Sequence, residues 1–260
     1  AFVSMGLNIR IVALVFLPLS LTMMIPFFLL KEEKLGKKET AAPASKAERA
    51  TVVKSISFVF QDKPYILWLC VLFVMNIGLQ LFLSGINEYF SNTNMNMTLV
   101  MAPCFAPVPF TIWVYNKLVK KKGLGFGFRY TLAVFAVSMA LMGLVHVLPQ
   151  GLLTPYAIFC GLIASFSIGA FFSVTYSIPS QRASVRREEN KSASSMYFAV
   201  QGLFEATSAA IASYVILTLL KETLSGAGVS FMTLIVAGAC MAAFAMSFFL
   251  PKDITLIGKE

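Results

Sequence analysis

Polar side chains recur on two apolar stretches of this chain at spacings that place them on one face of a helix. Positions that are four, four and three residues apart line up along a helix surface. The first stripe is made of Asn76, Gln80, Ser84 and Asn87, and the second of Tyr197, Gln201, Glu205 and Ser208. Amide, hydroxyl and carboxylate groups buried among apolar residues either bond a neighbouring helix or face a cavity. The first stripe therefore has two open interpretations, interhelical bonding or the wall of a ligand-sized cavity.

Glu205 is the only carboxylate well inside an apolar stretch. It lies 11 residues after Ser194, and Asn76 lies 11 residues after Tyr65, so both are expected near the middle of a membrane. An unpaired, ionised acid at the centre of a membrane helix costs roughly 2.5 kcal/mol or more. Glu205 is thus predicted to bind a ligand hydroxyl or take part in proton or cation coupling, or else to pair structurally with another helix. The predicted substrate-binding residues are Asn76, Gln80, Asn87, Tyr197, Gln201 and Glu205.

The elements that must position these residues are long apolar helices. Seven stretches are long enough to cross a hydrocarbon core, which needs about 20 helical residues. They are residues 9–30, 65–89, 96–117, 126–148, 153–178, 194–220 and 228–250. The hydrophobic fraction of 58% and the charged fraction of 13% are far from the balance of a soluble protein, in which about 25% of residues are charged. We predict an all-α membrane protein with several spans, the third of them kinked by Pro103, Pro107 and Pro109.

The positive charges alternate along the chain. Four segments hold 19 of the 21 Lys and Arg residues: 31–64, 117–129, 179–193 and the tail after 250. Because Lys and Arg favour the cytoplasmic side, these segments are predicted inside, with the first residue outside and the C-terminus inside. The net charge of +9 is therefore assigned to contact with anionic lipid headgroups and not to nucleic-acid binding.

Enzymatic function is not supported by the sequence. The single histidine, His146, has no Asp or Cys spaced to form a metal or nucleophile site. The four cysteines lie in four different apolar stretches, which suggests neither a disulfide framework nor a zinc site. We predict a protein that is not an enzyme and has no cofactor.

The domain organisation suggests part of a larger transporter. Residues 1–30 are predicted to hold one span, residues 31–64 a charged cytoplasmic linker ending in a short surface helix, residues 65–250 six spans, and residues 251–260 a cytoplasmic tail. The chain opens with Ala1, and its first span lacks the basic region and cleavage site of a signal peptide. This is the pattern expected when a transporter of two six-helix halves is cut before the last helix of its first half.

Two passages resemble one family. They are ISFVFQDKPYILWLCVLFVM, from residue 56, and IPSQRASVRREENKSASSMYFAVQGLFEATSAAIAS, at 178–213, in which residues 196–203 carry most of the likeness. Both resemble the second half of the glycoside-pentoside-hexuronide:cation symporters, the branch of the major facilitator superfamily that includes melibiose permease. One departure is visible, because Gln181, Arg182 and Ser184 follow Pro179 where family members commonly carry acidic residues.

The resemblance implies a major facilitator-type helical bundle in a bacterial cytoplasmic membrane. The coupling cation, Na+ or H+, would be bound mainly by acidic residues of the missing N-terminal half. The expected function is cation-coupled symport of a glycoside or other sugar, with membrane lipids and that other half as partners. Two alternatives remain: a facilitator of another substrate class, such as a lipid or drug, and a seven-helix receptor. The 34-residue basic linker at 31–64 and the absence of a D-R-Y triplet argue against the receptor.

Overall fold

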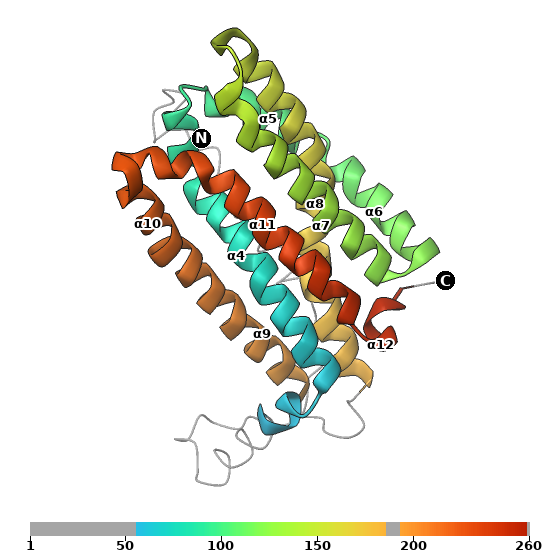
Figure 1. Cartoon of the computed structure of the whole chain (residues 1–260). Coiled ribbons are helices and arrows are strands. Elements are labelled where there is room, and N and C mark those ends of the chain that lie inside the picture. The colour runs from blue at the N-terminus through green and yellow to red at the C-terminus, as the bar shows by residue number, and fades with distance from the viewer. Residues whose placement is uncertain (1–55, 186–192, 259–260) are drawn as a thin grey trace, which may run out of the picture. The chain divides into compact units, whose positions relative to one another are not determined.

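The computed structural model describes residues 56–185 and 193–258, with helices numbered as in Figure 1 from α4 onward. These residues form helices joined by turns, with no strand among them. The predicted class of all-α membrane protein is confirmed. The predicted span at 9–30 and most of the linker at 31–64 lie outside the described residues, although residues 56–60 of the predicted surface helix are helical.

The α-helices are α4 Lys63–Asn92, α5 Met97–Phe105, α6 Val108–Lys122, α7 Leu124–Gly143, α8 Gln150–Val185, α9 Ala193–Ala210, α10 Leu217–Glu222, α11 Met232–Met246 and α12 Lys252–Thr255. Short 3₁₀ segments are η1 Leu144–Val147, η3 Thr223–Phe231 and η4 Ser247–Phe249. A π-helical turn, η2 Ile211–Ile216, joins α9 to α10.

Among the described residues, five helical segments are long and apolar enough to cross a membrane. They are Lys63–Asn92, Leu124–Val147, Gln150–Val185, Ser195–Glu222 and Gly228–Phe249. Helices α5 and α6 meet at 40° and form a sixth span if the bent pair counts as one. Pro107 stands in this break, so the kink predicted from the prolines is confirmed. Pro109 falls in the first turn of α6, where a missing N–H costs little.

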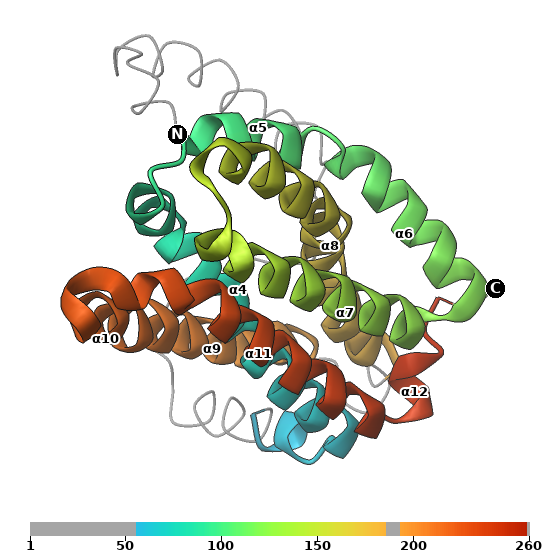
Figure 2. The same cartoon turned by 45° about the horizontal axis from the view of Figure 1, so that its top comes forward.

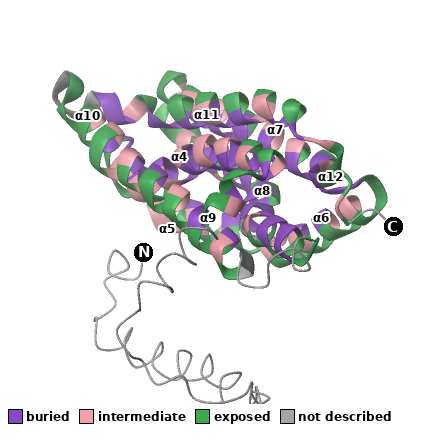
Figure 3. Ribbon diagram, turned by 90° about the horizontal axis from the view of Figure 1, so that it is seen from below, coloured by how far each residue is buried: buried purple, intermediate pink, exposed green. Residues whose placement is uncertain are grey.

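Helix α4 runs between α9 and α11, and α7 lies between α11 and α8 (Figures 1 and 2). Edge-to-face aromatic pairs join α4 to α7 and α7 to α8. The ring centroids of Trp68 and Phe128 are 5.3 Å apart, and those of Phe135 and Phe171 are 5.1 Å apart. Buried residues follow the inward faces of these helices, and exposed residues follow their outer faces (Figure 3).

Helices α5 and α8 approach closely because Gly161 has no side chain. A Cβ added to Gly161 would overlap the buried Cys104 Sγ, which belongs to α5. Small residues of this kind let membrane helices pack backbone to backbone.

We expect Gly161→Ala to destabilise the protein by about 1–3 kcal/mol, the usual cost of overpacking. Thermal loss of helical circular dichroism in detergent measures the effect. The double variant Gly161→Ala/Cys104→Ala should be more stable than the sum of the two single changes predicts, because it removes the sulfur that clashes. Strict additivity would contradict this account of the contact.

Candidate functional site

The two predicted polar stripes face each other where α4 packs against α9. Asn76 Nδ2 donates to Ser208 Oγ at 2.6 Å and to the Glu205 backbone oxygen at 3.1 Å. Further along both helices, the hydroxyls of Ser84 and Ser213 are 2.8 Å apart. Residues later in α4 pair with residues later in the α9 span, so the two helices run parallel. In this structure Asn76 thus bonds a neighbouring helix.

The span that begins with α9 continues through the π-helical turn η2. Asn76 bonds residues 129 and 132 positions further along the chain, and Ser84 bonds a residue 129 positions further. The two spans therefore keep one register into η2, where Ser213 meets Ser84.

Gln201 fixes the carboxylate of Glu205. Its Nε2 donates to Glu205 Oε1 at 2.8 Å and to the Thr175 backbone oxygen of α8 at 2.8 Å. Its Oε1 accepts a hydrogen bond from Trp68 Nε1 at 3.4 Å. Gln201 is buried, and all its hydrogen-bonding groups are engaged, so its amide has one orientation.

Glu205 itself is half-buried and keeps one oxygen open. Oε1 accepts from Gln201, while Oε2 has no hydrogen bond to any residue that the structure describes. A carboxylate oxygen can accept hydrogen bonds from a hydroxyl or contact a cation. Residues Asn76, Gln201 and Glu205 thus form a polar layer between α4, α8 and α9, and this polar layer is the candidate site.

The structure places the other predicted residues elsewhere. Tyr197 lies near the start of α9, eight residues before Glu205, or about 12 Å along a helix. Its hydroxyl donates to Asp62 Oδ2 at 3.0 Å, and its backbone oxygen accepts from the Tyr65 hydroxyl at 2.6 Å. Gln80 is half-buried and has no side-chain hydrogen bond to a described residue, and Asn87 is exposed near the far end of α4.

A buried charge pair was not predicted from the sequence. Arg182 Nε donates to Asp62 Oδ2 at 3.1 Å, and Arg182 Nη2 lies 2.5 Å from Asp62 Oδ1. Asp62 is only 1% exposed, and Arg182 is 9% exposed. Together with Tyr197, this Asp62 cluster joins the start of α4, the end of α8 and the start of α9. The sequence held one indication of this pair: Arg182 stands where the resembled family carries acidic residues.

Comparison with known protein families identifies the superfamily of this chain. The family model of the Major Facilitator Superfamily matches residues 1–209, well over half of the chain. The chain belongs to the Major Facilitator Superfamily. It is accordingly an integral, multi-pass membrane protein from a superfamily of secondary transporters. Comparisons with curated proteins and with solved structures find no match.

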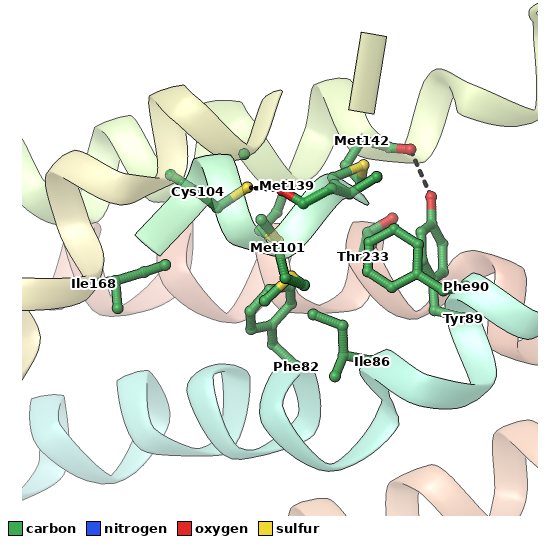
Figure 4. A pocket seen from close by; sticks show the side chains of 13 residues that line it. Phe82, Ile86, Tyr89, Phe90, Met101, Cys104, Met139, Met142, Ile168 and Thr233 are labelled. Carbon is green, nitrogen blue, oxygen red and sulfur yellow. Dashed lines mark hydrogen bonds between the residues drawn. The ribbon is translucent and has the colours of Figure 1, made fainter. Parts of the chain in front are cut away.

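A cavity in the core of this facilitator bundle lies away from the polar layer. It has a volume of about 10 Å³, the room of one water-sized sphere, and apolar side chains dominate its wall (Figure 4). The labelled residues around it are Phe82, Ile86, Tyr89, Phe90, Met101, Cys104, Met139, Met142, Ile168 and Thr233. None of the six predicted substrate-binding residues lines it.

A second, more open cavity of about 300 Å³ lies where α4 ends and α8 begins. It is lined by Thr93, Asn94, Met95, Gln150, Leu153 and Thr154. This cavity also contains none of the predicted substrate-binding residues. In this facilitator the candidate site is therefore the polar layer at Glu205, which borders the exposed face of α9.

Proposed function

We propose that this chain is the C-terminal part of a symporter that carries a glycoside or related sugar together with a cation. Membership of the Major Facilitator Superfamily supports secondary transport in general. The sugar substrate is argued from one observation. Among the described apolar spans, Glu205 is the carboxylate that lies well away from a helix end, and Gln201 holds it with its second oxygen open.

The chemistry of the polar layer suits a hydroxyl-rich ligand. An ionised carboxylate accepts hydrogen bonds strongly, and a hydrogen bond to a charged group contributes about 1.5–3 kcal/mol. The oriented Gln201 amide prevents the carboxylate from turning away, so little ordering is left for the ligand to induce. A sugar hydroxyl could therefore be bound at Glu205 Oε2 without rearrangement of α4 or α8.

The exposed face of α9 supports a site shared with another part of the transporter. In the apolar 18-residue stretch of Ser195–Glu222 only 17% of the residues are buried. The corresponding share is 56% in Lys63–Asn92 and 65% in Gln150–Val185. We propose that a first six-helix half supplies the opposite wall and most of the groups that bind the coupling cation, Na+ or H+. The two halves would rock around this midplane site, as in other transporters built from structural repeats. We propose that the protein lies in a bacterial cytoplasmic membrane, with its C-terminus on the cytoplasmic side.

Uptake into proteoliposomes tests this function. The protein encoded by the complete reading frame that contains this chain is reconstituted, and radiolabelled melibiose is offered with an inward Na+ gradient, an inward proton gradient or neither. We expect accumulation above the equilibrium level under one of the two gradients and its loss when an ionophore dissipates that gradient.

A parallel panel of p-nitrophenyl glycosides of galactose, glucose, xylose and glucuronic acid tests whether another sugar competes better than melibiose. Competition by one of them would keep the proposal and name the sugar. Absence of accumulation and of competition throughout, with gradient-driven transport of ethidium instead, would overturn it in favour of a drug carrier.

A further inference from the structure

One end of the described bundle combines exposed aromatic rings with lysine and arginine side chains. At this basic end α6 and α11 finish and α7 begins. We call the group the basic-aromatic collar, and its members are Trp113, Lys117, Lys121, Lys122, Phe126, Arg129 and Phe248; Phe110, in the first turn of α6, stacks on Trp113 and extends the collar along the helix. We propose that the basic-aromatic collar binds the headgroup phosphate of anionic phospholipids.

The first part of the collar is one face of α6. Phe110 and Trp113 stack with ring centroids 5.8 Å apart, and Lys117 Nζ lies 3.8 Å from the centre of the Trp113 ring. Both rings are more than half exposed. The positions are three and four residues apart, so the rings and the ammonium group follow one face toward the end of the helix. A lysine with its stem on apolar surface and its head in water fits the boundary of a membrane.

The second part joins α6, α7 and α11. Lys122 Nζ lies 4.2 Å from the centre of the Phe126 ring, and the guanidinium of Arg129 lies 4.3 Å from that of Phe248. Arg129 Nη2 donates to the Ser247 backbone oxygen at 3.0 Å, whereas its Nε is buried without a hydrogen-bond partner among the described residues. All three cation–π pairs of the described residues thus occur in this collar.

The turn that carries the lysines is held in place. Gly123 has φ = 88°, a conformation that favours glycine, and its missing Cβ would come within 2.7 Å of the Thr255 backbone oxygen. Leu124 N donates to the Ile257 backbone oxygen at 2.9 Å. The segment after α11 therefore braces the turn between α6 and α7, and the cationic groups stand on a fixed frame.

The charge around the collar is one-sided. The sequence has no Asp or Glu between Glu88 and Glu188, a range that contains all of α5, α6, α7 and α8. In the bracing segment Lys252 and Asp253 offset each other. Basic clusters next to membrane helices attract anionic lipids, and aromatic rings settle at the depth of the headgroups. The exposed rings favour a lipid phosphate over a phosphate in solution, because only the lipid brings acyl chains to cover them.

The two tryptophans allow a direct test. Trp113 is exposed in the collar, whereas Trp68 is fully buried. The full chain with Trp68→Phe, which leaves Trp113 as the sole reporter, is placed in phosphatidylcholine vesicles containing either brominated phosphatidylglycerol or the same fraction of brominated phosphatidylcholine. We expect bromine on the anionic lipid to quench Trp113 with an apparent affinity at least about threefold higher, a preference that about 0.5 M NaCl weakens by screening.

Two variants give the controls. In Lys117→Gln/Lys121→Gln/Lys122→Gln the apparent affinities for the two brominated lipids should be nearly equal. If that variant does not fold, the salt series on the protein with its three lysines gives the same information. With Trp68→Phe kept, a reporter moved to α8 by Trp113→Phe/Phe159→Trp should be quenched equally by both lipids, because Phe159 is exposed on a span with no basic residue near it. Equal quenching of Trp113 by both lipids at low salt, or an equal preference at position 159, would overturn the proposal.

Discussion

Glu205→Gln in the complete transporter is expected to lower the initial rate of glycoside uptake at least about tenfold, with the amount of protein in the membrane unchanged. Gln keeps the size of the side chain and can still bond Gln201, so α9 should pack as before. What is lost is the charged acceptor for a sugar hydroxyl, which contributes about 1.5–3 kcal/mol, and each 1.4 kcal/mol is a factor of ten in binding. Initial rates at low substrate, normalised to transporter quantified by immunoblot, measure the effect.

Glu88→Gln is the matched control for this prediction. Glu88 is a carboxylate near the far end of α4, and its Oε1 lies 2.5 Å from Lys221 Nζ. Both side chains are more than a third exposed, so the pair should have little influence on a midplane site. Gln201→Ala should lower uptake nearly as much as Glu205→Gln, since it frees the carboxylate to turn away. Equal uptake in wild type, Glu205→Gln and Gln201→Ala would contradict the assignment of the polar layer.

Arg182→Met is expected to destabilise the protein by about 3–5 kcal/mol, the usual cost of removing one partner of a buried ion pair. The change leaves Asp62 almost fully buried, with Tyr197 as its remaining side-chain donor. Met keeps most of the apolar stem of Arg, so the loss comes mainly from the uncompensated charge. Thermal unfolding in detergent can be followed with a thiol-reactive dye, because Cys104, Cys160 and Cys240 are buried in the folded protein.

The double variant Asp62→Asn/Arg182→Met separates charge from packing. Replacing both members of a buried pair costs much less than replacing one, so the double variant should recover a large part of the lost stability. Lys221→Met, which breaks the exposed pair with Glu88, should change stability by no more than about 1 kcal/mol. If Arg182→Met were as mild as Lys221→Met, the Asp62 cluster would not be a structural clamp.

The helices could be predicted well from the sequence because their signals are local. Long apolar runs identify membrane spans, and a proline can break a helix because it removes a hydrogen bond. The break between α5 and α6 therefore appears at Pro107 as predicted. The three-to-four-residue spacing also predicted that Asn76 and Glu205 lie on polar faces of their helices, and these faces meet.

The spacing of polar residues could not predict which neighbouring residues each polar helix face would bond. Asn76 bonds Ser208 because α4 and α9 run parallel in one register, which depends on the packing of the whole bundle. Tyr197 follows the same stripe as Gln201 but lies far enough toward the helix start to bond Asp62. Asp62 and Arg182 are 120 residues apart, and no local pattern indicates that the two charges are buried together. Ser213, which meets Ser84, lies in a π-turn that the sequence did not reveal.

The most direct test of the proposed site is equilibrium binding of glycosides to the purified complete transporter. The p-nitrophenyl glycoside that competes best in the uptake panel serves as the probe, and its dissociation constant is measured for wild type, Glu205→Gln and Glu88→Gln at one pH and salt concentration. We predict that the dissociation constant rises at least about tenfold in Glu205→Gln and stays unchanged in Glu88→Gln. The same affinity in all three proteins would contradict the placement of the sugar at Glu205.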